Sequence, residues 1–295
     1  MKKLTFNTAY ATLQKIAPPR FLAAIKKTGA YRAGSRIAKK CLPNDYKPSW
    51  QTISAGPMKG HELYIDPSGE WQRQMLDGVY DTFFFDFLDK MDLSGKTAFD
   101  IGAHLGFHTL HFAQKVGQSG SVIAFEPNPA NIGRLSMIVD KNKDLSGRIA
   151  IVNKAVSDRK GSIAFTCSDT IDDGASCGGF IEGSDTFYEK SSYEEKRGFH
   201  PITVEALSLD EAIGSGTLKK PDLIKIDIEG AEHLAIKGAV NTLKKYMPIL
   251  LIEIHSKLND EIITPLLGQI GYDVVVLKKE DGNRCFIAGL PKKLY

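Results

Sequence analysis

Seven short apolar runs alternate with helical segments between residue 97 and residue 288. The runs are rich in β-branched residues and nearly continuous, which is typical of strands buried on both faces of a mostly parallel sheet. The repetition of strand, helix and strand predicts a doubly wound α/β domain. The predicted strands are Thr97–Ile101, Ser121–Phe125, Ile149–Asn153, Leu223–Ile228, Ile249–Ile254, Tyr272–Leu277 and Cys285–Ala288. The predicted helices are Gly106–Lys115, Pro129–Asn142, Glu232–Lys245 and Asp260–Ile270, preceded by an aromatic-rich helix over residues 70–92.

The first fifty residues are strongly basic. They carry eleven Lys or Arg against one acid, Asp45, so they contribute +10 to a formal net charge of +3 and the remainder carries −7. Apolar residues between Phe6 and Ala17 recur at helical spacing. We expect a basic helical extension over residues 1–60 and a main domain over residues 61–295. Such an extension binds an anionic membrane surface or a nucleic acid, or it covers the main domain as a solvated arm.

No apolar stretch approaches the roughly 18 residues of a membrane span, and no export signal is readable behind Met1. The four cysteines form no C-x-x-C pair, which indicates reduced thiols rather than a zinc knuckle or a disulfide scaffold. We therefore expect a cytoplasmic protein, at the inner face of the membrane if the basic segment binds lipid. One stretch, residues 167–200, interrupts the alternation and is interpreted as a lid or substrate-selecting loop, or as a surface excursion.

A glycine turn follows the first strand of the predicted sheet, in the sequence Asp100-Ile101-Gly102-Ala103-His104-Leu105-Gly106. Gly102 and Gly106 have no Cβ, so the backbone turns sharply and approaches a ligand closely. The helix that follows offers free N–H groups to an anionic group. The second strand ends at Glu126, an acid that can accept hydrogen bonds from both hydroxyls of a ribose. This order predicts a site for an adenosine-containing cofactor.

Two such cofactors compete, a nicotinamide dinucleotide and S-adenosylmethionine. The dinucleotide fingerprint requires G-x-G-x-x-G, and residues 103–105 break it. Asp100 would repel a pyrophosphate, whereas it suits the ammonium group of a methionine moiety. The sequence therefore favours S-adenosylmethionine.

Charged residues occur at every second position on the fourth predicted strand and at the end of the fifth. Lys225, Asp227 and Glu229 share one face of the fourth, and the fifth ends with Glu253 and His255 on one face. If the first and fourth strands flank the reversal of strand order, Asp227 and Glu229 face the same crevice as the glycine turn. The alternative is an internal pairing of Lys225 with a carboxylate, or a helix N-cap.

Two groups of residues have side chains that can bind a metal ion. His104, His108 and His111 lie at helical spacing, but His104 belongs to the turn, so we assign no metal to them. A magnesium ion held by Asp227 and Glu229 suits hard oxygen ligands and stays unassigned.

Five motifs follow one another in the chain: F-D-I-G-A-H-L-G-F-H-T (99–109), V-I-A-F-E-P-N-P (122–129), N-K-A-V-S-D (153–158), P-D-L-I-K-I-D-I-E-G-A-E (221–232) and I-L-L-I-E-I-H (249–255). Together they resemble the FkbM-type family of S-adenosylmethionine-dependent methyltransferases. The resemblance covers about Gly78 to Ala288, leaving out the basic first fifty residues. It implies a seven-stranded Rossmann-like sheet whose last strand runs antiparallel, and O-methylation of hydroxyls on sugars, glycolipids or polyketides.

The resemblance also implies cofactor contacts along these motifs. His104 and His108 depart from the pattern, because they stand where the family usually carries Asn and Tyr. The candidate cofactor-binding residues are Asp100, Gly102, His104, Gly106, Thr109, Glu126, Pro127, Asn128, Ala155, Val156 and Asp227.

We expect the protein to be an O-methyltransferase that acts on a small-molecule, glycan or glycolipid acceptor. Methyl transfer is an in-line displacement, so a base must remove the proton of the acceptor hydroxyl as the new bond forms. The candidates are Asp227, Glu229, Glu253 and His255. His255 has the most suitable ordinary pKa, and Asp227 has the best predicted position.

Two other function classes stay open on the sequence. The first is a non-catalytic S-adenosylmethionine-binding scaffold anchored through the basic segment. The second is a nucleic-acid methyltransferase that uses this segment as its phosphate contact. Against the second, the fourth strand lacks an Asn-Pro-Pro-Tyr signature and residues 51–295 are net acidic, so we expect no nucleic-acid partner.

Overall fold

The computed structural model describes residues 48–168, 178–184, 199–280 and 284–292. The predicted helix between Phe6 and Ala17 and nearly all of the basic segment lie outside this part of the chain, as does most of the predicted 167–200 loop. Within the described ranges, no helix combines the length and the apolar character that crossing a bilayer requires.

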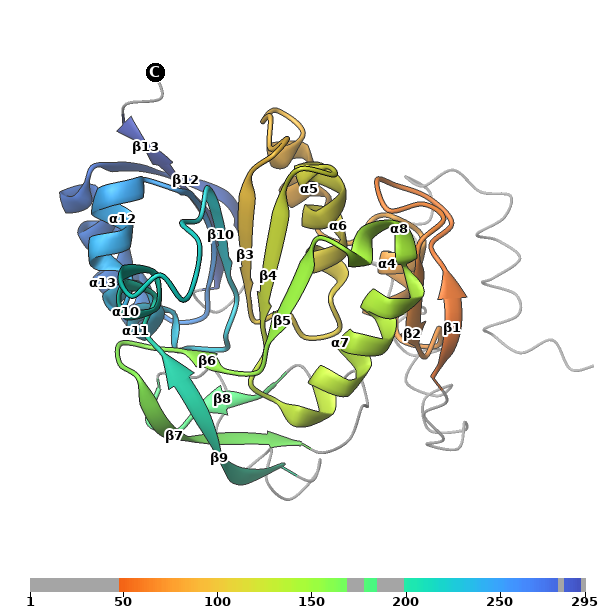
Figure 1. Ribbon diagram of the computed structural model, residues 1–295, viewed down its shortest axis with the longest axis horizontal. Helices are drawn as coiled ribbons and strands as arrows, with labels where there is room; N and C mark the ends of the chain where they lie inside the picture. Colours follow the sequence, from red (N-terminus) through yellow and green to blue (C-terminus); the bar gives the residue numbers. More distant parts are fainter. Residues whose placement is uncertain (1–47, 169–177, 185–198, 281–283, 293–295) are drawn as a thin grey trace, which may run out of the picture. The chain divides into compact units, whose positions relative to one another are not determined.

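A seven-stranded sheet forms the centre, with the strand order β12-β13-β11-β10-β3-β4-β5 (Figure 1). All seven predicted runs are strands of this sheet, which confirms the α/β fold. The strand β13 pairs antiparallel with both of its neighbours, as the family resemblance implies, and the other neighbouring pairs are parallel. The strands are β3 (Thr97–Ile101), β4 (Ser121–Phe125), β5 (Ile149–Val152), β10 (Leu223–Ile226), β11 (Ile249–Ile254), β12 (Tyr272–Lys279) and β13 (Cys285–Pro291).

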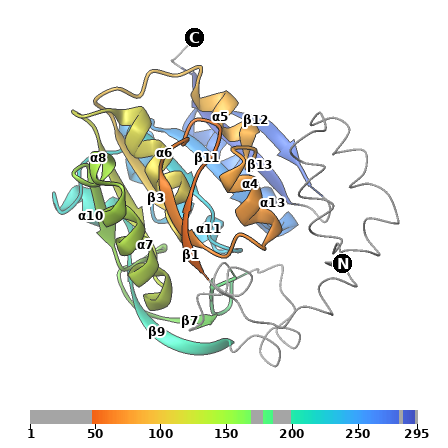
Figure 2. The same cartoon turned by 90° about the vertical axis from the view of Figure 1, so that its right-hand side faces the viewer.

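Helices cover both faces of this sheet (Figures 1 and 2). Because side chains alternate along a strand, Ala98 and Val122 pack toward one set of helices while Phe99 and Ile123 pack toward the other. The first set is α6 (Phe107–Val116), α7 (Pro129–Lys141) and α8 (Lys143–Ser146). The second set is α10 (Leu209–Gly214), α11 (Glu232–Lys237), α12 (Val240–Tyr246) and α13 (Lys257–Ile270).

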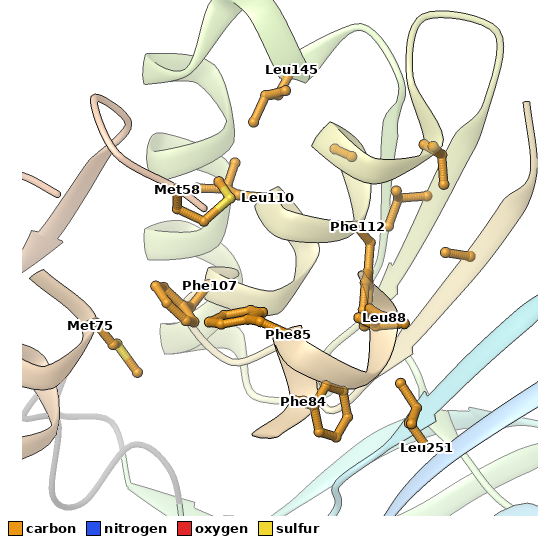
Figure 3. Packing of buried hydrophobic residues seen from close by; sticks show 14 of the residues in the cluster. Met58, Met75, Phe84, Phe85, Leu88, Phe107, Leu110, Phe112, Leu145 and Leu251 are labelled. Atoms are coloured by element: carbon orange, nitrogen blue, oxygen red, sulfur yellow. The ribbon is translucent and has the colours of Figure 1, made fainter. Parts of the chain in front are cut away.

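The aromatic-rich segment forms two helices, α4 (Glu70–Leu76) and α5 (Thr82–Leu88), so the expectation of one helix over residues 70–92 is wrong. Gly78 breaks the helix with φ +65°, and a Cβ there would lie 2.3 Å from the carbonyl oxygen of Ala55. Figure 3 shows how α5 meets α6, with the Phe85 ring beside that of Phe107 at a centroid separation of 5.8 Å.

The predicted helix Glu232–Lys245 is likewise two helices, α11 and α12. Gly238 ends α11, and a Cβ there would lie 2.1 Å from the Ser157 carbonyl oxygen. The Gly238 carbonyl also accepts a hydrogen bond from the Ser208 hydroxyl at 2.9 Å. This close approach joins the helical face to the loop after β6, and an unbroken helix would not allow it.

A second sheet, which the sequence analysis missed, has the order β6-β9-β7-β8. Its strands β7 and β9 pair antiparallel along their length, from Gly161 opposite Ala206 to Ser168 opposite Phe199. The ends of the 167–200 segment therefore belong to strands. The four strands are β6 (Ala155–Val156), β7 (Gly161–Ser168), β8 (Phe180–Ile181) and β9 (Phe199–Leu207).

A hairpin of β1 (Ser49–Thr52) and β2 (Glu62–Ile65) packs against the first helical layer. The Asn142 side chain, at the end of α7, fixes β2 by accepting from the Glu62 N–H and donating to its carbonyl, both at 2.9 Å. The predicted boundary at residue 60 falls between the two strands of this hairpin. The extent of the basic extension stays a prediction.

Candidate cofactor and acceptor site

A cavity of about 480 Å³ lies where β3, β4, β10 and β11 end at their carboxyl termini. This is the position at which doubly wound sheets bind ligands, next to the reversal of strand order between β3 and β10. Residues from α4, the second sheet and the β12–β13 hairpin complete the walls, among them Trp71, Phe165 and Arg284. The volume suits a small organic ligand.

The glycine turn lies against the end of β10. Gly102 has φ +82°, and a Cβ there would lie 1.9 Å from the carbonyl oxygen of Asp227. The Asp227 N–H donates to the Ile101 carbonyl at 3.1 Å, so the two strand ends are joined through their backbones. Gly106 is also required, because its φ is +90° and a Cβ would meet Leu135 at 2.4 Å, but it does not line the cavity.

Glu126 holds two loops together at the end of β4. Its Oε2 accepts from the His104 N–H at 2.9 Å, and its Oε1 accepts from the Asn128 N–H at 2.9 Å and the Asn131 side chain at 3.2 Å. Burial raises the pKa of Glu126 above its ordinary value, although these hydrogen bonds oppose the shift. The carboxylate lines the cavity, and two oxygens with about four acceptor positions can take a further donor.

Apolar side chains line the cavity beyond Glu126. Ala155 and Val156 come from β6, and Phe165 and Ile181 come from β7 and β8. Pro127 and Asn128 lie beside them, and Asn128 caps α7 by accepting from the Ala130 N–H at 2.9 Å. The second sheet thus supplies a narrow apolar wall next to a buried acid.

Asp100 and Thr109 lie behind the cavity wall rather than in it. The Thr109 hydroxyl donates to Asp100 Oδ2 at 2.5 Å, and Asp100 Oδ1 is 3.3 Å from Lys225 Nζ. Lys225 also donates to the Gly102 carbonyl at 3.0 Å. Burial would lower the pKa of Lys225, but the charges of Asp227 and Asp100 outweigh it and raise the pKa above its ordinary value.

Asp227 pairs with Lys225 and also faces the cavity. Its Oδ2 is 3.3 Å from Lys225 Nζ, so the internal pairing that the sequence left open is present. The side chain is nevertheless 31% exposed and lines the cavity. Burial would raise the pKa of Asp227, but Lys225 and His255 lower it to about 2.

Beyond Asp227 lies a group of acids around His255. The Nε2 atom of His255 is 3.8 Å from Asp227 Oδ1, 3.5 Å from Glu229 Oε2 and 3.4 Å from Glu253 Oε1. Its Nδ1 is 2.8 Å from Glu232 Oε1. Glu229 and Glu253 line the cavity, whereas His255 lies behind them with 1% of its side chain exposed.

The ionisable side chains around His255 have pKa values that are shifted from their ordinary values. Burial raises the pKa of Glu229 to about 7 and that of Glu253 to about 8, in each case with a contribution from the Asp227 charge. Burial would lower the pKa of His255, but Glu232 and Glu229 outweigh it and raise that pKa well above 6.5. His255 therefore does not have the near-neutral pKa that the sequence analysis assumed.

The three histidines of the turn and α6 have separate surroundings. The His104 ring is 2.9 Å from Arg134, and burial followed by the Arg134 charge lowers the pKa of His104 well below 6.5. His108 pairs with Asp81 at 3.2 Å. His111 packs edge-on against Phe85, and burial lowers its pKa to about 3.

The structure brings most of the sequence-predicted residues to one cavity. Those that line it are Gly102, His104, Glu126, Pro127, Asn128, Ala155, Val156, Asp227, Glu229 and Glu253. Asp100, Gly106, Thr109 and His255 support it from behind. Lining residues that the sequence analysis missed include Trp71, Asp81, Asn131, Phe165 and Arg284. Phe165 lies in β7, which pairs with β9. The alternation of Ile202, Val204 and Ala206 in β9 was the sign in the sequence that a strand is present there.

The fold and the site together define a Rossmann-like α/β domain with a glycine turn and a strand-end acid bordering one cavity. The family model described as "Methyltransferase FkbM domain" matches residues 100–274. The chain belongs to this family.

Two relatives and one solved structure are similar to the chain. A "Hexuronic acid methyltransferase AglP" from Haloferax volcanii is 28% identical over 61% of this chain and 64% of its own length. A "2-O-methyltransferase NoeI" from Sinorhizobium fredii is 32% identical over 50% of this chain and 58% of its own. The chain thus spans less than two thirds of these relatives. A crystal structure of a methyltransferase FkbM from Methylobacillus flagellatus KT aligns with TM-score 0.46 and 17% identity, covering 67% of this chain and 44% of that one.

Proposed function

We propose that the protein transfers the methyl group of S-adenosylmethionine to a hydroxyl group of a sugar or glycan. One observation carries this proposal. The strand-end acid Glu126 and the carboxylates of Asp227, Glu229 and Glu253 line the same cavity, so an adenosine site and a group of potential proton acceptors are adjacent.

The cofactor half of the cavity suits each part of S-adenosylmethionine. The Glu126 carboxylate accepts the ribose hydroxyls, and the apolar wall of Val156, Phe165 and Ile181 takes the adenine ring. The methionine portion lies along the turn at Gly102, which lines the cavity beside Asp227. The sulfonium then faces Asp227 and Glu229, whose negative charge stabilises a cation.

The acceptor hydroxyl lies between this sulfonium and Glu229. Aligning the hydroxyl oxygen with the methyl carbon is the main task of the enzyme. Asp227 is paired with Lys225 and Glu253 with Arg284, whereas no Lys or Arg of the described ranges lies within 4 Å of Glu229. Glu229 is therefore the carboxylate that is open to receive the proton.

The class of acceptor rests on the printed names of the two relatives, which specify a hexuronic acid and a 2-O position. The experiment incubates purified protein with S-adenosylmethionine and a panel of neutral and uronic-acid glycans. Mass spectrometry follows S-adenosylhomocysteine and the methylated glycan.

We expect Glu229→Gln to slow methyl transfer by about 10²–10⁴-fold while S-adenosylmethionine binding persists. The matched control is Glu261→Gln, because Glu261 is 59% exposed on α13 and lines no part of the cavity. Tight cofactor binding without S-adenosylhomocysteine from any acceptor would instead support the non-catalytic scaffold. Methylation of RNA or DNA in place of glycans would support the nucleic-acid alternative.

A further inference from the structure

His255 is a fully buried side chain with one nitrogen satisfied and one unsatisfied. Its Nδ1 meets Glu232 Oε1 at 2.8 Å, and Glu232 is itself buried at the start of α11, where the same oxygen accepts from the Gly230 N–H. Its Nε2 makes no hydrogen bond, although three carboxylate oxygens lie 3.4–3.8 Å away. A buried polar atom without a partner is rare enough to require an explanation.

The atoms around this Nε2 have the separations of a ligand set. One oxygen of Asp227, one of Glu229 and the imidazole nitrogen of His255 all lie within 4.8 Å of one another. Divalent cations bind such atoms at about 2.0–2.6 Å, so two ligands of one ion lie up to about 5 Å apart. The acids around His255 raise its pKa, so an ion at the centre of the three would have to displace the Nε2 proton before it binds the electron pair of that nitrogen. Ligation in this position would give the otherwise unpartnered Nε2 a partner.

The contact between His255 and Glu232 fits the same interpretation. Histidines that bind metals usually donate their other ring N–H to a carboxylate, which fixes the ring orientation and raises the basicity of the ligating nitrogen. Glu232 supplies that carboxylate at 2.8 Å on the side of the ring away from Asp227, Glu229 and Glu253.

The charge balance of the site also leaves room for a cation. The side chains in contact around Lys225 and His255 include five carboxylates, those of Asp100, Asp227, Glu229, Glu232 and Glu253. Lys225 and Arg284 are the permanent cations that pair with them among the described residues. When all five carboxylates are ionised and His255 is neutral, which binding of a metal would require, five negative charges face two permanent positive ones. A divalent cation would offset most of that difference and would replace the proton that His255 otherwise carries.

We propose that Asp227, Glu229 and His255 bind a divalent cation at the acceptor end of the cavity. The two carboxylates suit Mn²⁺ as they suit Mg²⁺ and Ca²⁺, and the imidazole favours a transition-metal ion, so Mn²⁺ is the ion used in the test. The proposal rests on the proposed methyl transfer for its role, although binding of the ion does not depend on that role.

The cation would act on the acceptor hydroxyl as a Lewis acid. Binding of the hydroxyl oxygen to the cation would weaken the O–H bond. The proton would pass to the second carboxylate oxygen of ionised Glu253, because Arg284 and His255 both contact its Oε1. The oxygen electron pair forms the new bond to the methyl carbon while the carbon–sulfur bond breaks, and its electrons leave with neutral S-adenosylhomocysteine. In this form Glu229 acts as a ligand rather than as the direct proton acceptor.

The experiment begins with full-length protein that has been stripped with EDTA and desalted. Mn²⁺ is titrated while electron paramagnetic resonance measures the free ion, without acceptor or turnover. We expect one Mn²⁺ per chain, and His255→Gln and Glu229→Gln should each weaken its binding at least tenfold. Glu232→Gln, which changes only the supporting contact, should weaken it by about 10–100-fold. S-adenosylmethionine binding by each variant checks that it folds.

The matched control is His61→Gln. His61 also meets a carboxylate, Asp144, at 3.1 Å, but this is a single acid that lines no part of the cavity. This variant should bind Mn²⁺ as the unchanged protein does. Absence of Mn²⁺ binding, or equal binding by folded His255→Gln, would overturn the metal site.

The two proposals fail in distinguishable ways. Full methyl transfer by stripped protein in EDTA would remove the metal from the mechanism and leave the proposed function and the role of Glu229 as proton acceptor in place. Stoichiometric Mn²⁺ binding with no methylated glycan would support the metal site and contradict the proposed function.

Discussion

The two halves of the cavity are built in different ways. In the half proposed for the cofactor, backbone groups fix the arrangement: two N–H groups donate to Glu126, and Gly102 allows two strand ends to touch. In the half proposed for the acceptor, charged side chains fix it, with Lys225, Arg284 and His255 among carboxylates. The cofactor half thus depends on a position that has no Cβ atom, and the acceptor half depends on the balance of charge between side chains. Substitutions should therefore damage them through different mechanisms.

The largest effect should come from removing the buried cation of the acceptor half. Lys225→Met leaves the fully buried Asp100 without its cation, and breaking a buried pair typically costs about 3–5 kcal/mol of unfolding free energy. The matched control is Lys237→Met, because Lys237 pairs with Asp158 at the same 3.3 Å while its side chain is 69% exposed. That pair should contribute about 0–1 kcal/mol. Urea unfolding measures both, and equal losses would contradict the role of burial.

A smaller loss should follow from adding one methyl group to the cofactor half. Gly102→Ala combines a positive φ with a Cβ 1.9 Å from the Asp227 carbonyl, and we expect roughly 2–4 kcal/mol of destabilisation. Gly60→Ala is the control, since Gly60 has φ +93° with nothing within 4 Å of its Cβ position. Gly60→Ala should be destabilised by only about 1–2 kcal/mol, which is the cost of a positive φ in a residue with a Cβ. Thermal melts that shift equally would show that the contact with β10 is unimportant.

The smallest effect in this series concerns cofactor affinity. Glu126→Ala should weaken S-adenosylmethionine binding by about 1.5–3 kcal/mol through the loss of hydrogen bonds to a charged group. The exposed Glu205→Ala should leave the affinity unchanged. Calorimetry gives both values, together with the melting temperature, because Glu126 also holds the loops of His104 and Asn128. Unaltered affinity in a stable Glu126→Ala would remove Glu126 from the ribose site.

The same residue gives a pH dependence with a defined sign. Burial raises the pKa of Glu126 above 4.5, so the carboxylate becomes neutral at a higher pH than an exposed glutamate does. The affinity for S-adenosylmethionine should therefore fall as the pH falls through this raised pKa. Glu126→Gln, in which this position does not titrate, should lose this part of the pH dependence and keep the part that comes from Glu229, whose pKa is about 7.

Local sequence patterns predict the central sheet and the placement of Gly102 and Glu126 at one cavity. Each strand from Thr97–Ile101 to Cys285–Pro291 is a short apolar run, and the turn at Gly102 and the acid at Glu126 are fixed by their place at strand ends. The helix breaks at Gly78 and Gly238 were missed because each depends on a backbone contact with a residue far away in the sequence. The second sheet was missed for a similar reason, since β7 and β9 are separated by the long 167–200 segment.

The sequence predicts which residues line or support the acceptor half, but it does not predict how their side chains pair. The spacing of Asp227, Glu229, Glu253 and His255 indicates that they meet. It does not indicate that Lys225 holds Asp227 or that Glu232 holds His255, because these pairings depend on side-chain packing. The interpretation of the basic first fifty residues as a membrane-binding segment stays a prediction.

The position of β13 between β11 and β12 has a consequence for the acceptor half. Among the described strands, β12 pairs with β13 alone, so the pairing of β13 with β11 is what attaches the β12–β13 hairpin to the sheet. The same pairing sets Cys285 opposite Ile254 and brings Arg284 to Glu253. The same strand pairing thus extends the sheet and places the counter-ion of Glu253. A change that separates β13 from β11 would therefore also remove Arg284 from the acceptor half.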